Sequence, residues 1–482
     1  MLGRFLLILG SIWLGRISIQ SARQFGKKRA IRCRRNGGGE DRISALPDDL
    51  LVRILLLVPT EDVVATMILS KRWRFVWTMV PQLEYNDIEY GTRKICLGGL
   101  LGFLFGKSER PQSIRRFLTE SMRLHKAPVL ETLSIELGPH FPVAVNVKMW
   151  IANAVDRRVR ELGFALKWSG GPISLPKSLY MCETIEHLHL SDKVYVDVSS
   201  SPVCLPFLTS LELVSVIYKD EDSLVRLLSS CPILKSLHVM RRDKDNVTKF
   251  SVKVPSLETF MYNHVASFIE DVGESLVIDS ASLKKFFISD GWTTSCSIEN
   301  KPRLDNARIY IWFDPDEEFM RSLSSVVYLE LELNVATVAC LEAIIFSQLT
   351  ECKIRPCELD WFEPLVLLLQ NSPKLKVLVI DQVLFRNEDF PLSWNQPSSV
   401  PECLSTNLEV FEWAGYGGTT EQKDMVSYIF ANSKCLKRVG ISLSSTCKRK
   451  DRKKIMKELE SMSRISTSSQ LLFSTQLKFT CC

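Results

Sequence analysis

The sequence is poor in cysteine and contains no pair of the CxxC type. Its 14 cysteines are scattered through 482 residues, a pattern that excludes a disulfide framework or a zinc site of the usual spacing. A reduced compartment, the cytosol or the nucleus, fits this use of cysteine best. Long apolar runs are also absent, because the stretch Phe5 to Leu14 is too short to cross a bilayer. No membrane span is therefore expected.

The sequence also lacks the residue patterns of catalytic and cofactor sites. Gly102 to Ser108 resembles a phosphate-binding loop, but the first glycine of that motif falls on Leu101. The six histidines form no HExxH pattern; His187 and His189 would share a strand face and bind a metal only with a third ligand. Cys352 and Cys357 are expected to be small buried hydrophobic residues. The sequence predicts no catalytic residue, no cofactor and no metal site.

The net charge of +6 is concentrated at one end of the chain. Residues 1–40 hold nine of the 61 basic residues and one of the 55 acidic ones, so the remainder, with 52 basic and 54 acidic residues, is nearly neutral. A body without a broad basic surface is not expected to bind nucleic acid. The basic extension has four open interpretations: a signal peptide, an organelle transit peptide, a nuclear address, or a leader without function.

Residues 41–83 have the pattern of a small three-helix module. Pro47 suits a first helical turn, Pro59 ends that helix, Thr60 is expected to cap a second helix, and Ser70 a third. The first helix carries apolar residues at helical spacing, namely Leu46, Leu50, Leu51, Ile54, Leu55 and Val58. About forty residues cannot bury so many large side chains internally. The module is therefore either an interface with a partner or a cap on the rest of the chain.

From about residue 125 to 445 one hexapeptide pattern, apolar-x-x-apolar-x-apolar, keeps returning. It begins at Leu130, Val159, Ile185, Leu208, Leu234, Leu257, Leu283, Leu304, Val326, Leu349, Leu375, Leu408 and Leu436. This spacing is typical of leucine-rich repeats. Asp220 to Pro232 and Glu363 to Pro373 have helical spacing, as does the basic run Lys448 to Lys457.

The predicted fold is an α/β leucine-rich-repeat solenoid of parallel strands alternating with helices, preceded by the small all-α module. Each repeat buries its apolar faces against its neighbours. The polar positions of the hexapeptides include Glu186, His187, His189, Thr209, Ser210 and Glu212, and those of them that project from the concave sheet are candidate ligand contacts. The alternative for any one of them is an ordinary solvated strand residue.

The runs I-S-x-L-P-D-x-L-L, P-T-x-D-V and S-K-R-W-x-x-x-W in residues 43–77 resemble an F-box of the plant type. This resemblance implies binding to the Skp-type adaptor of a cullin-based ubiquitin ligase. The positions that match the family's adaptor contacts are Leu46, Pro47, Leu50, Ile54, Leu55, Leu69 and Trp73. Leu56 and Met67 depart from the family pattern, because serine is common at both positions.

The rest of the chain resembles plant F-box proteins with leucine-rich repeats, notably in HKAPVLETL, AVDRRVREL and DEDSLVRLLSSCP. From about residue 400 it looks like the FBD domain that ends one subgroup of that family. The expected organisation is a basic N-terminal extension (1–40), an F-box (41–87), leucine-rich repeats (110–395) and an FBD domain (396–475) that closes the solenoid.

The resemblance implies a non-catalytic substrate-recognition subunit of a Skp-cullin-F-box (SCF) ligase, whose repeats bind an unidentified target protein for ubiquitination. The alternative is a protein-binding scaffold on leucine-rich repeats with no ligase role. A cytoplasmic or nuclear location is expected, with an organelle or secretory address left open by residues 1–40.

Overall fold

The computed structural model describes residues 43, 45–86, 118–139, 147–167, 170–198, 202–242, 245–265, 274–291, 295–311, 315–333, 340–342, 344–356, 361–382, 394–447 and 449–473. The basic extension, the segment Gly102 to Ser108 and Cys357 lie outside the described residues. The chain divides into two compact units, residues 1–51 and 52–482.

Short helices begin the described chain, namely α3 (Asp48–Leu55), α4 (Thr60–Ala65), η3 (Thr66–Ile68), α5 (Trp73–Val76) and η4 (Trp77–Met79). Asp48 and Asp49 stand in the first turn of α3, where acidic side chains complement the helix dipole. Two predicted caps are wrong. Thr60 is already helical, and its hydroxyl accepts a hydrogen bond from the backbone N–H of Glu84; α5 begins at Trp73, after Arg72 rather than Ser70.

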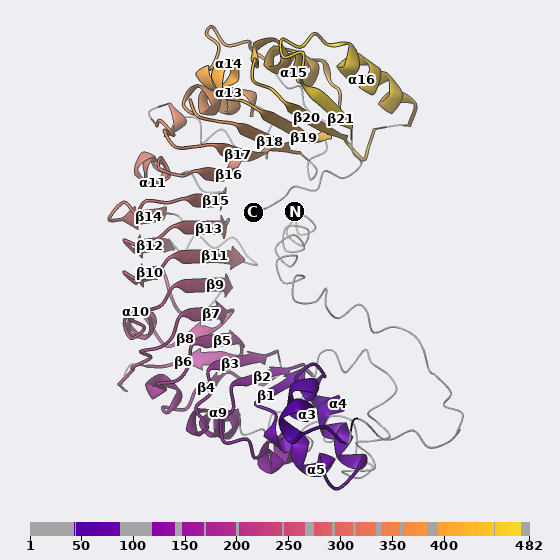
Figure 1. The fold of residues 1–482 in the computed structure, drawn as a ribbon. Coiled ribbons are helices and arrows are strands. Elements are labelled where there is room, and N and C mark those ends of the chain that lie inside the picture. Colours follow the sequence, from indigo (N-terminus) through magenta and orange to yellow (C-terminus); the bar gives the residue numbers. More distant parts are fainter. Residues whose placement is uncertain are drawn as a thin grey trace, which may run out of the picture. The chain divides into compact units, whose positions relative to one another are not determined.

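The main element of the rest of the described chain is one parallel sheet of 15 strands, which lie in the sheet in the order of the sequence (Figure 1). Its strands are β1 (Gln82–Asn86), β2 (Thr132–Leu137), β3 (Glu161–Leu166), β5 (His187–Asp192), β7 (Ser210–Val214), β9 (Ser236–Arg242), β11 (Thr259–Val265), β13 (Lys285–Asp290), β15 (Asn306–Ile311), β16 (Tyr328–Leu333), β17 (Glu351–Pro356), β18 (Val377–Asp381), β19 (Val410–Tyr416), β20 (Arg438–Leu443) and β21 (Gln470–Phe473). All thirteen predicted hexapeptides fall on strands of this sheet, so the predicted leucine-rich-repeat solenoid is confirmed.

The register of the sheet stacks equivalent apolar residues of successive repeats. Leu211 pairs with Leu188 on one side and with Leu237 on the other, and these leucines are buried. One face of the strands therefore forms a continuous core between repeats, while the alternate residues lie on the opposite face. This second face is called the open face below.

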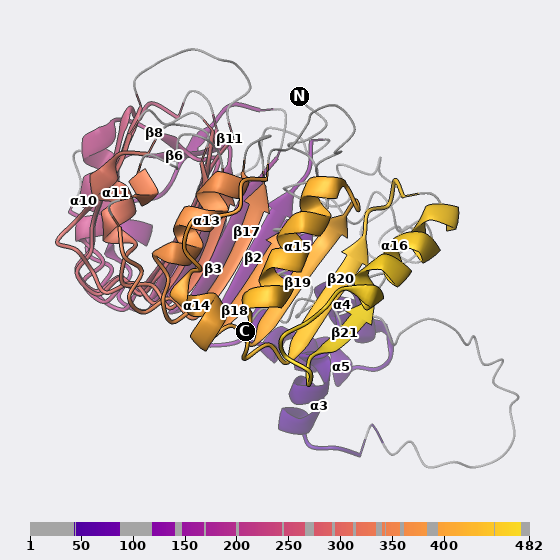
Figure 2. The same ribbon diagram turned by 90° about the horizontal axis from the view of Figure 1, so that it is seen from above.

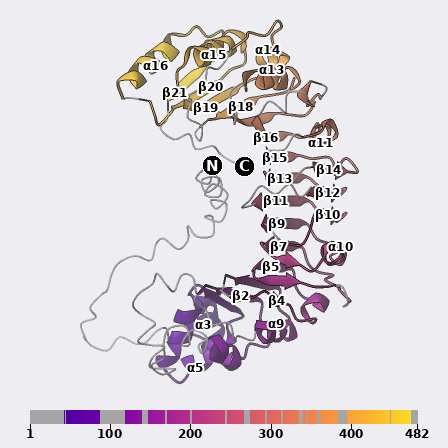
Figure 3. The same cartoon turned by 180° about the vertical axis from the view of Figure 1, so that it is seen from behind.

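Helices and short strands form the other layer of the repeats. The helices and 3₁₀ turn are α9 (Val147–Asp156), η5 (Leu179–Met181), α10 (Glu221–Ser229), α11 (Glu317–Ser322), α13 (Phe362–Gln370) and α14 (Glu402–Thr406). Two three-stranded sheets are β4 (Ile173–Ser174), β6 (Val194–Val196), β8 (Ile217–Tyr218) and β10 (Lys249–Lys253), β12 (Ser275–Asp279), β14 (Ser295–Glu299). Figures 1 and 3 show α10, α11, β10, β12 and β14 along one side of the main sheet.

The helices predicted in two repeats are confirmed, as α10 and α13, and Asp220 caps α10 by accepting a hydrogen bond from the N–H of Ser223. Between α10 and α13, several repeats have a short strand instead of a helix in the layer beside the main sheet. In β12, for example, Leu276 and Ile278 are buried and their neighbours are less so. This period of two favours a strand over a helix.

The C-terminal region continues the same sheet rather than forming a separate body. Strand β18 pairs with β19, β19 with β20, and β20 with β21. Helix α15 (Thr420–Asn432) connects β19 to β20, and α16 (Arg449–Ser461) precedes β21, as Figure 2 shows. Ile455 and Leu459 are the buried side of α16, which confirms the predicted amphipathic helix.

Candidate functional site

Helix α3 carries three of the residues expected to contact an adaptor. Leu50 and Ile54 lie one turn apart on this helix and are exposed, whereas Leu55 is buried. Leu46 is half-buried and Pro47 is exposed just before the helix. Leu50 and Ile54 are thus available to a partner, and Leu55 contributes to the chain's own core.

The two remaining predicted contacts differ in the same way. Leu69 follows η3 and is 63% exposed, while Trp73, the first residue of α5, is only 7% exposed. Val76 and Trp77 are buried with Trp73 at helical spacing. The tryptophan side chain is therefore packed inside the module and supports its surface.

Sequence reasoning missed three exposed apolar residues of the module. Leu57, after α3, is 86% exposed, Phe75 in α5 is 63% exposed, and Met79 in η4 is also exposed. Phe75 and Met79 are four positions apart and lie outside the series Trp73, Val76, Trp77. The helical spacing could have identified them, since a side chain outside the buried series faces away from the core.

The end of the helical module is joined to the first repeat by hydrogen bonds. The carbonyl of Thr78 accepts from the N–H groups of Lys126 and Ala127, both at 2.8 Å, and the Pro81 carbonyl accepts from Thr132 N–H at 3.2 Å. The Nε2–H of His125 donates to the Val80 carbonyl at 2.6 Å. These contacts connect η4 and β1 to β2.

The open face of the sheet carries the candidate ligand contacts of the repeats. His187 and His189 lie on the same face of β5, as predicted, and His189 Nδ1 is 2.7 Å from Glu212 Oε2. Glu186 pairs with Arg160 at 3.5 Å. Within the described ranges, no group of three or more His, Cys, Asp and Glu residues is arranged to hold a metal ion. Cys352 is buried, as predicted.

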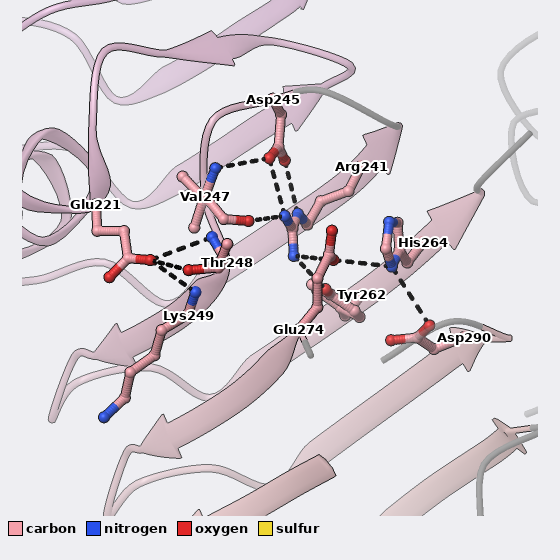
Figure 4. Close-up of polar contacts among 10 residues, drawn as sticks. All are labelled: Glu221, Arg241, Asp245, Val247, Thr248, Lys249, Tyr262, His264, Glu274 and Asp290. Atoms are coloured by element: carbon pink, nitrogen blue, oxygen red, sulfur yellow. Dashed lines mark hydrogen bonds and ion pairs between the residues drawn. The ribbon is translucent and has the colours of Figure 1, made fainter. Parts of the chain in front are cut away.

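A charged cluster replaces apolar residues at the ends of three neighbouring strands (Figure 4). The register aligns Arg241 of β9 with His264 of β11 and Asp290 of β13, whereas the next strand has Ile311 at this position. Arg241 binds Asp245 through two nitrogen–oxygen contacts of 2.6 and 2.8 Å. The cluster is buried, so its ion pairs and hydrogen bonds must satisfy its charges.

Glu274 links the two halves of this cluster. Its Oε2 atom lies 3.2 Å from Arg241 Nη1 and 3.5 Å from His264 Nδ1, and the same His264 nitrogen lies 3.5 Å from Asp290 Oδ1. Burial raises the pKa of Glu274, although Arg241 and His264 oppose that effect. The cluster therefore links the ends of β9, β11 and β13 to Asp245, which follows β9, and to Glu274, which precedes β12.

In the part of the chain that the structure describes, no helix has the length and apolar character that crossing a membrane requires.

Three protein-family models match separate regions of the chain. The F-box domain model matches residues 43–84, the model for LRR repeats of an FBD-associated F-box protein matches residues 147–309, and the FBD model matches residues 396–441. These matches lie on the helical module, the repeat sheet and the β19–α15–β20 segment.

Several proteins of Arabidopsis thaliana are similar to the chain over almost its whole length. One named as an F-box/FBD/LRR-repeat protein is 48% identical over 456 residues, covering 91% of this chain and 92% of the relative. A second with that description is 46% identical and covers 91% and 97%. One named as an FBD-associated F-box protein is 45% identical and covers 90% and 98%.

Proposed function

Because the chain belongs to the plant F-box/FBD/LRR-repeat family, we propose that it is the substrate-recognition subunit of an SCF-type ubiquitin ligase. The observation that carries this proposal is the surface of the helical module. Leu57, Leu69 and Phe75 are large apolar side chains that the chain itself leaves exposed. Exposed apolar side chains of this kind mark protein-binding surfaces when they gather on one small module.

In this proposal the predicted contacts divide into two groups. The exposed residues Leu50, Ile54 and Leu69 bury their side chains against the Skp-type adaptor, which in turn binds a cullin. Leu55 and Trp73 act from inside the module by holding the helices that present those residues. Removal of an exposed side chain then weakens docking, whereas removal of a buried one also weakens the fold.

The repeats hold the target protein in this proposal. A target bound to the open face is brought close to the ubiquitin-loaded enzyme on the cullin, which raises its effective concentration for transfer. The chain's own residues then form no covalent intermediate. The proposed location is the cytosol or the nucleus.

Co-purification tests the adaptor contact. The tagged full chain is expected to retain a plant Skp-type adaptor, and Leu57→Asp with Leu69→Asp is expected to lose it, because a carboxylate in an apolar contact loses its hydration without gaining a partner. Both residues are exposed, so the change leaves the core intact.

A matched control is Met181→Asp, an exposed apolar residue of the repeat region. It is expected to retain the adaptor at the wild-type level. If the Leu57/Leu69 variant also retained the adaptor, the proposed docking surface would be wrong. If the wild-type chain bound no adaptor, the result would favour a scaffold without a ligase role.

A further inference from the structure

The chain passes from the helical module into the sheet between η4 and β1. Met79 ends η4 and Gln82 begins β1, so two residues, Val80 and Pro81, separate these elements. Strand β1 is held in the sheet by five residue pairs with β2. Rotation about the backbone bonds of Val80 would nevertheless turn the preceding helices relative to the sheet. Residues 80–81 are called the hinge point below.

A closed ring of hydrogen bonds spans the hinge point. The carbonyl of Thr78 accepts from the N–H of Ala127 at 2.8 Å. The Ala127 carbonyl accepts from Arg157 Nη2 at 2.6 Å, and the same nitrogen donates to His125 Nδ1. The Nε2–H of His125 closes the ring at the Val80 carbonyl, at 2.6 Å. A rotation at the hinge point therefore breaks at least one bond of the ring.

The ring is shielded from water on most of its circumference. Thr78, Val80, His125 and Ala127 are each at most 6% exposed, and Arg157, which follows α9, is half-buried. A buried polar group that loses its partner is destabilised, because water cannot reach it to replace that partner. Burial therefore makes the closed ring much more favourable than any arrangement in which the helices have turned away.

Other contacts hold the two sides of the hinge point in the same arrangement. The Thr60 hydroxyl in α4 accepts from the N–H of Glu84 in β1 at 2.8 Å. The Tyr85 hydroxyl in β1 donates to the Ser121 hydroxyl at 2.8 Å, and Ser121 in turn donates to the carbonyl of Leu118. The helical segment 118–124 and the residues after it are thus bound both to β1 and to the end of η4.

The ring is also joined to the proposed docking surface. The hydroxyl of Thr78 donates to the carbonyl of Phe75 at 2.6 Å, and Phe75 in α5 is one of the exposed apolar residues proposed to contact the adaptor. Thr78 therefore binds α5 through its side chain and the segment before β2 through its carbonyl. The direction of α5 is tied to the first repeat by one buried residue.

We propose that His125 and Arg157 are positioning residues, which hold the hinge point in one conformation and so fix the direction of α4 and α5 relative to the first repeats. This inference rests on the proposed function. Ubiquitin transfer is efficient when the target is held in a suitable position relative to the loaded enzyme. A closed ring keeps a bound target in one position, whereas an open ring spreads it over many.

A distance measurement between two spin labels by double electron–electron resonance tests the proposal. Genetically encoded spin-labelled residues replace Arg74 in α5 and Glu183 in the repeats, both of which are exposed, so the cysteines of the chain stay unlabelled. The wild-type chain is expected to give one narrow distance distribution. In Arg157→Ala and in His125→Ala, which open the ring at different bonds, the distribution is expected to widen by about twofold or more.

Two control variants separate positioning from a general loss of structure. His125→Gln keeps a donor for the Val80 carbonyl and an acceptor for Arg157, so it is expected to keep the narrow distribution. Arg123→Ala removes an exposed arginine that pairs with Glu120 of its own helical segment, and it is expected to have no effect. Wild-type widths in both ring variants, or equal widening in the two controls, would overturn the proposal.

Adaptor affinity separates this inference from the proposed function. The ring variants keep Leu57, Leu69 and Phe75, and they are expected to bind the adaptor with the Kd of the wild type while their distance distribution stays wide. Loss of adaptor binding in both ring variants would show damage to the module itself and would overturn the positioning role. If the wild type bound no adaptor but both ring variants widened, the ligase role would be wrong and the ring would still hold the hinge point. Adaptor binding with unchanged widths would refute the role of the ring alone.

Discussion

The guanidinium of Arg157 donates a hydrogen bond to Nδ1 of His125, whose Nε2–H donates to the carbonyl of Val80. The same Arg157 group donates to the Ala127 carbonyl at 2.6 Å. Together these bonds join the residues after η4 to the first repeat. His125 can accept from Arg157 only while it is neutral, so the junction depends on its protonation state.

Acidification is expected to weaken this junction. Burial, with a further contribution from Arg157, lowers the pKa of His125 to about 4, against about 6.5 in an unfolded chain. The unfolded state therefore binds more protons between these values, and stability falls as the pH decreases from 7 to 5, by on the order of 2 kcal/mol. Denaturant unfolding at several pH values measures this slope.

The variant His125→Gln keeps an amide donor and an acceptor but removes the titration. Its stability is expected to change less over the same pH range than that of the wild type. An identical slope in the two proteins would contradict the assignment of a neutral His125 to the junction.

The repeat core is expected to be sensitive to truncation at equivalent positions. Leu211, Leu237 and Leu378 are fully buried. Changing any of them to Ala is expected to cost about 2 to 5 kcal/mol through lost transfer free energy and the cavity that remains. The neighbouring changes Ser210→Ala and Ser236→Ala are expected to cost less, and hydrogen exchange is expected to place the damage in the altered repeat and its neighbours. Equal effects at the Leu and Ser positions would disprove the register.

The buried ion pairs of β16 and β17 are expected to matter for stability. Burial alone would raise the pKa of Glu330, but Lys353 and Arg355 outweigh it and lower the pKa below its ordinary value. Glu330→Ala leaves these cations without their partner and is expected to cost about 3 to 5 kcal/mol. In the wild type, the ion pairs of Glu330 stabilise the folded state fully at pH values above the ordinary pKa of a carboxyl group. This stabilisation is lost as the pH falls through the lowered pKa of Glu330. Unfolding curves at pH 7 and pH 3 measure both effects, and a variant as stable as the wild type at pH 7 would contradict them.

The turn before α15 is expected to require glycine at position 418. Gly418 has a φ of +75°, and an added Cβ would lie 2.8 Å from Ile455 Cδ1. Gly418→Ala is therefore expected to destabilise the C-terminal region by about 1 to 3 kcal/mol through backbone strain and contact with α16. Faster hydrogen exchange confined to α15 and α16 would show this, and unchanged exchange there would refute it.

The repeat strands were predictable because the hexapeptide is a local pattern, and each strand from β2 to β20 in the main sheet begins at the third residue of its hexapeptide. Strand β1 carries the same pattern in Val80, Leu83 and Tyr85, although these residues fall within the F-box range expected from the sequence, 41–87. Strand β21 has no apolar residue at the first position of that pattern, so its place in the sheet depends on pairing with β20.

Other features depend on contacts between residues far apart in sequence. Thr60 has the residue type of a helix cap, but its hydroxyl binds the N–H of Glu84, 24 residues away. The alignment of Arg241, His264 and Asp290 follows from the strand register, which composition alone does not provide. For the candidate site, helical spacing identified apolar residues, but only packing separated the buried Leu55 and Trp73 from the exposed Leu69.

Assembly with purified partners tests the central claim most directly. The full chain is mixed with a plant Skp-type adaptor and its cullin, and the products are measured by size-exclusion chromatography with light scattering. The expected result is a complex with one copy of each protein, which the Leu57→Asp/Leu69→Asp variant does not form although its own folding is unchanged. A wild-type chain that elutes alone, while the adaptor and cullin elute together, would contradict the assignment as a ligase subunit.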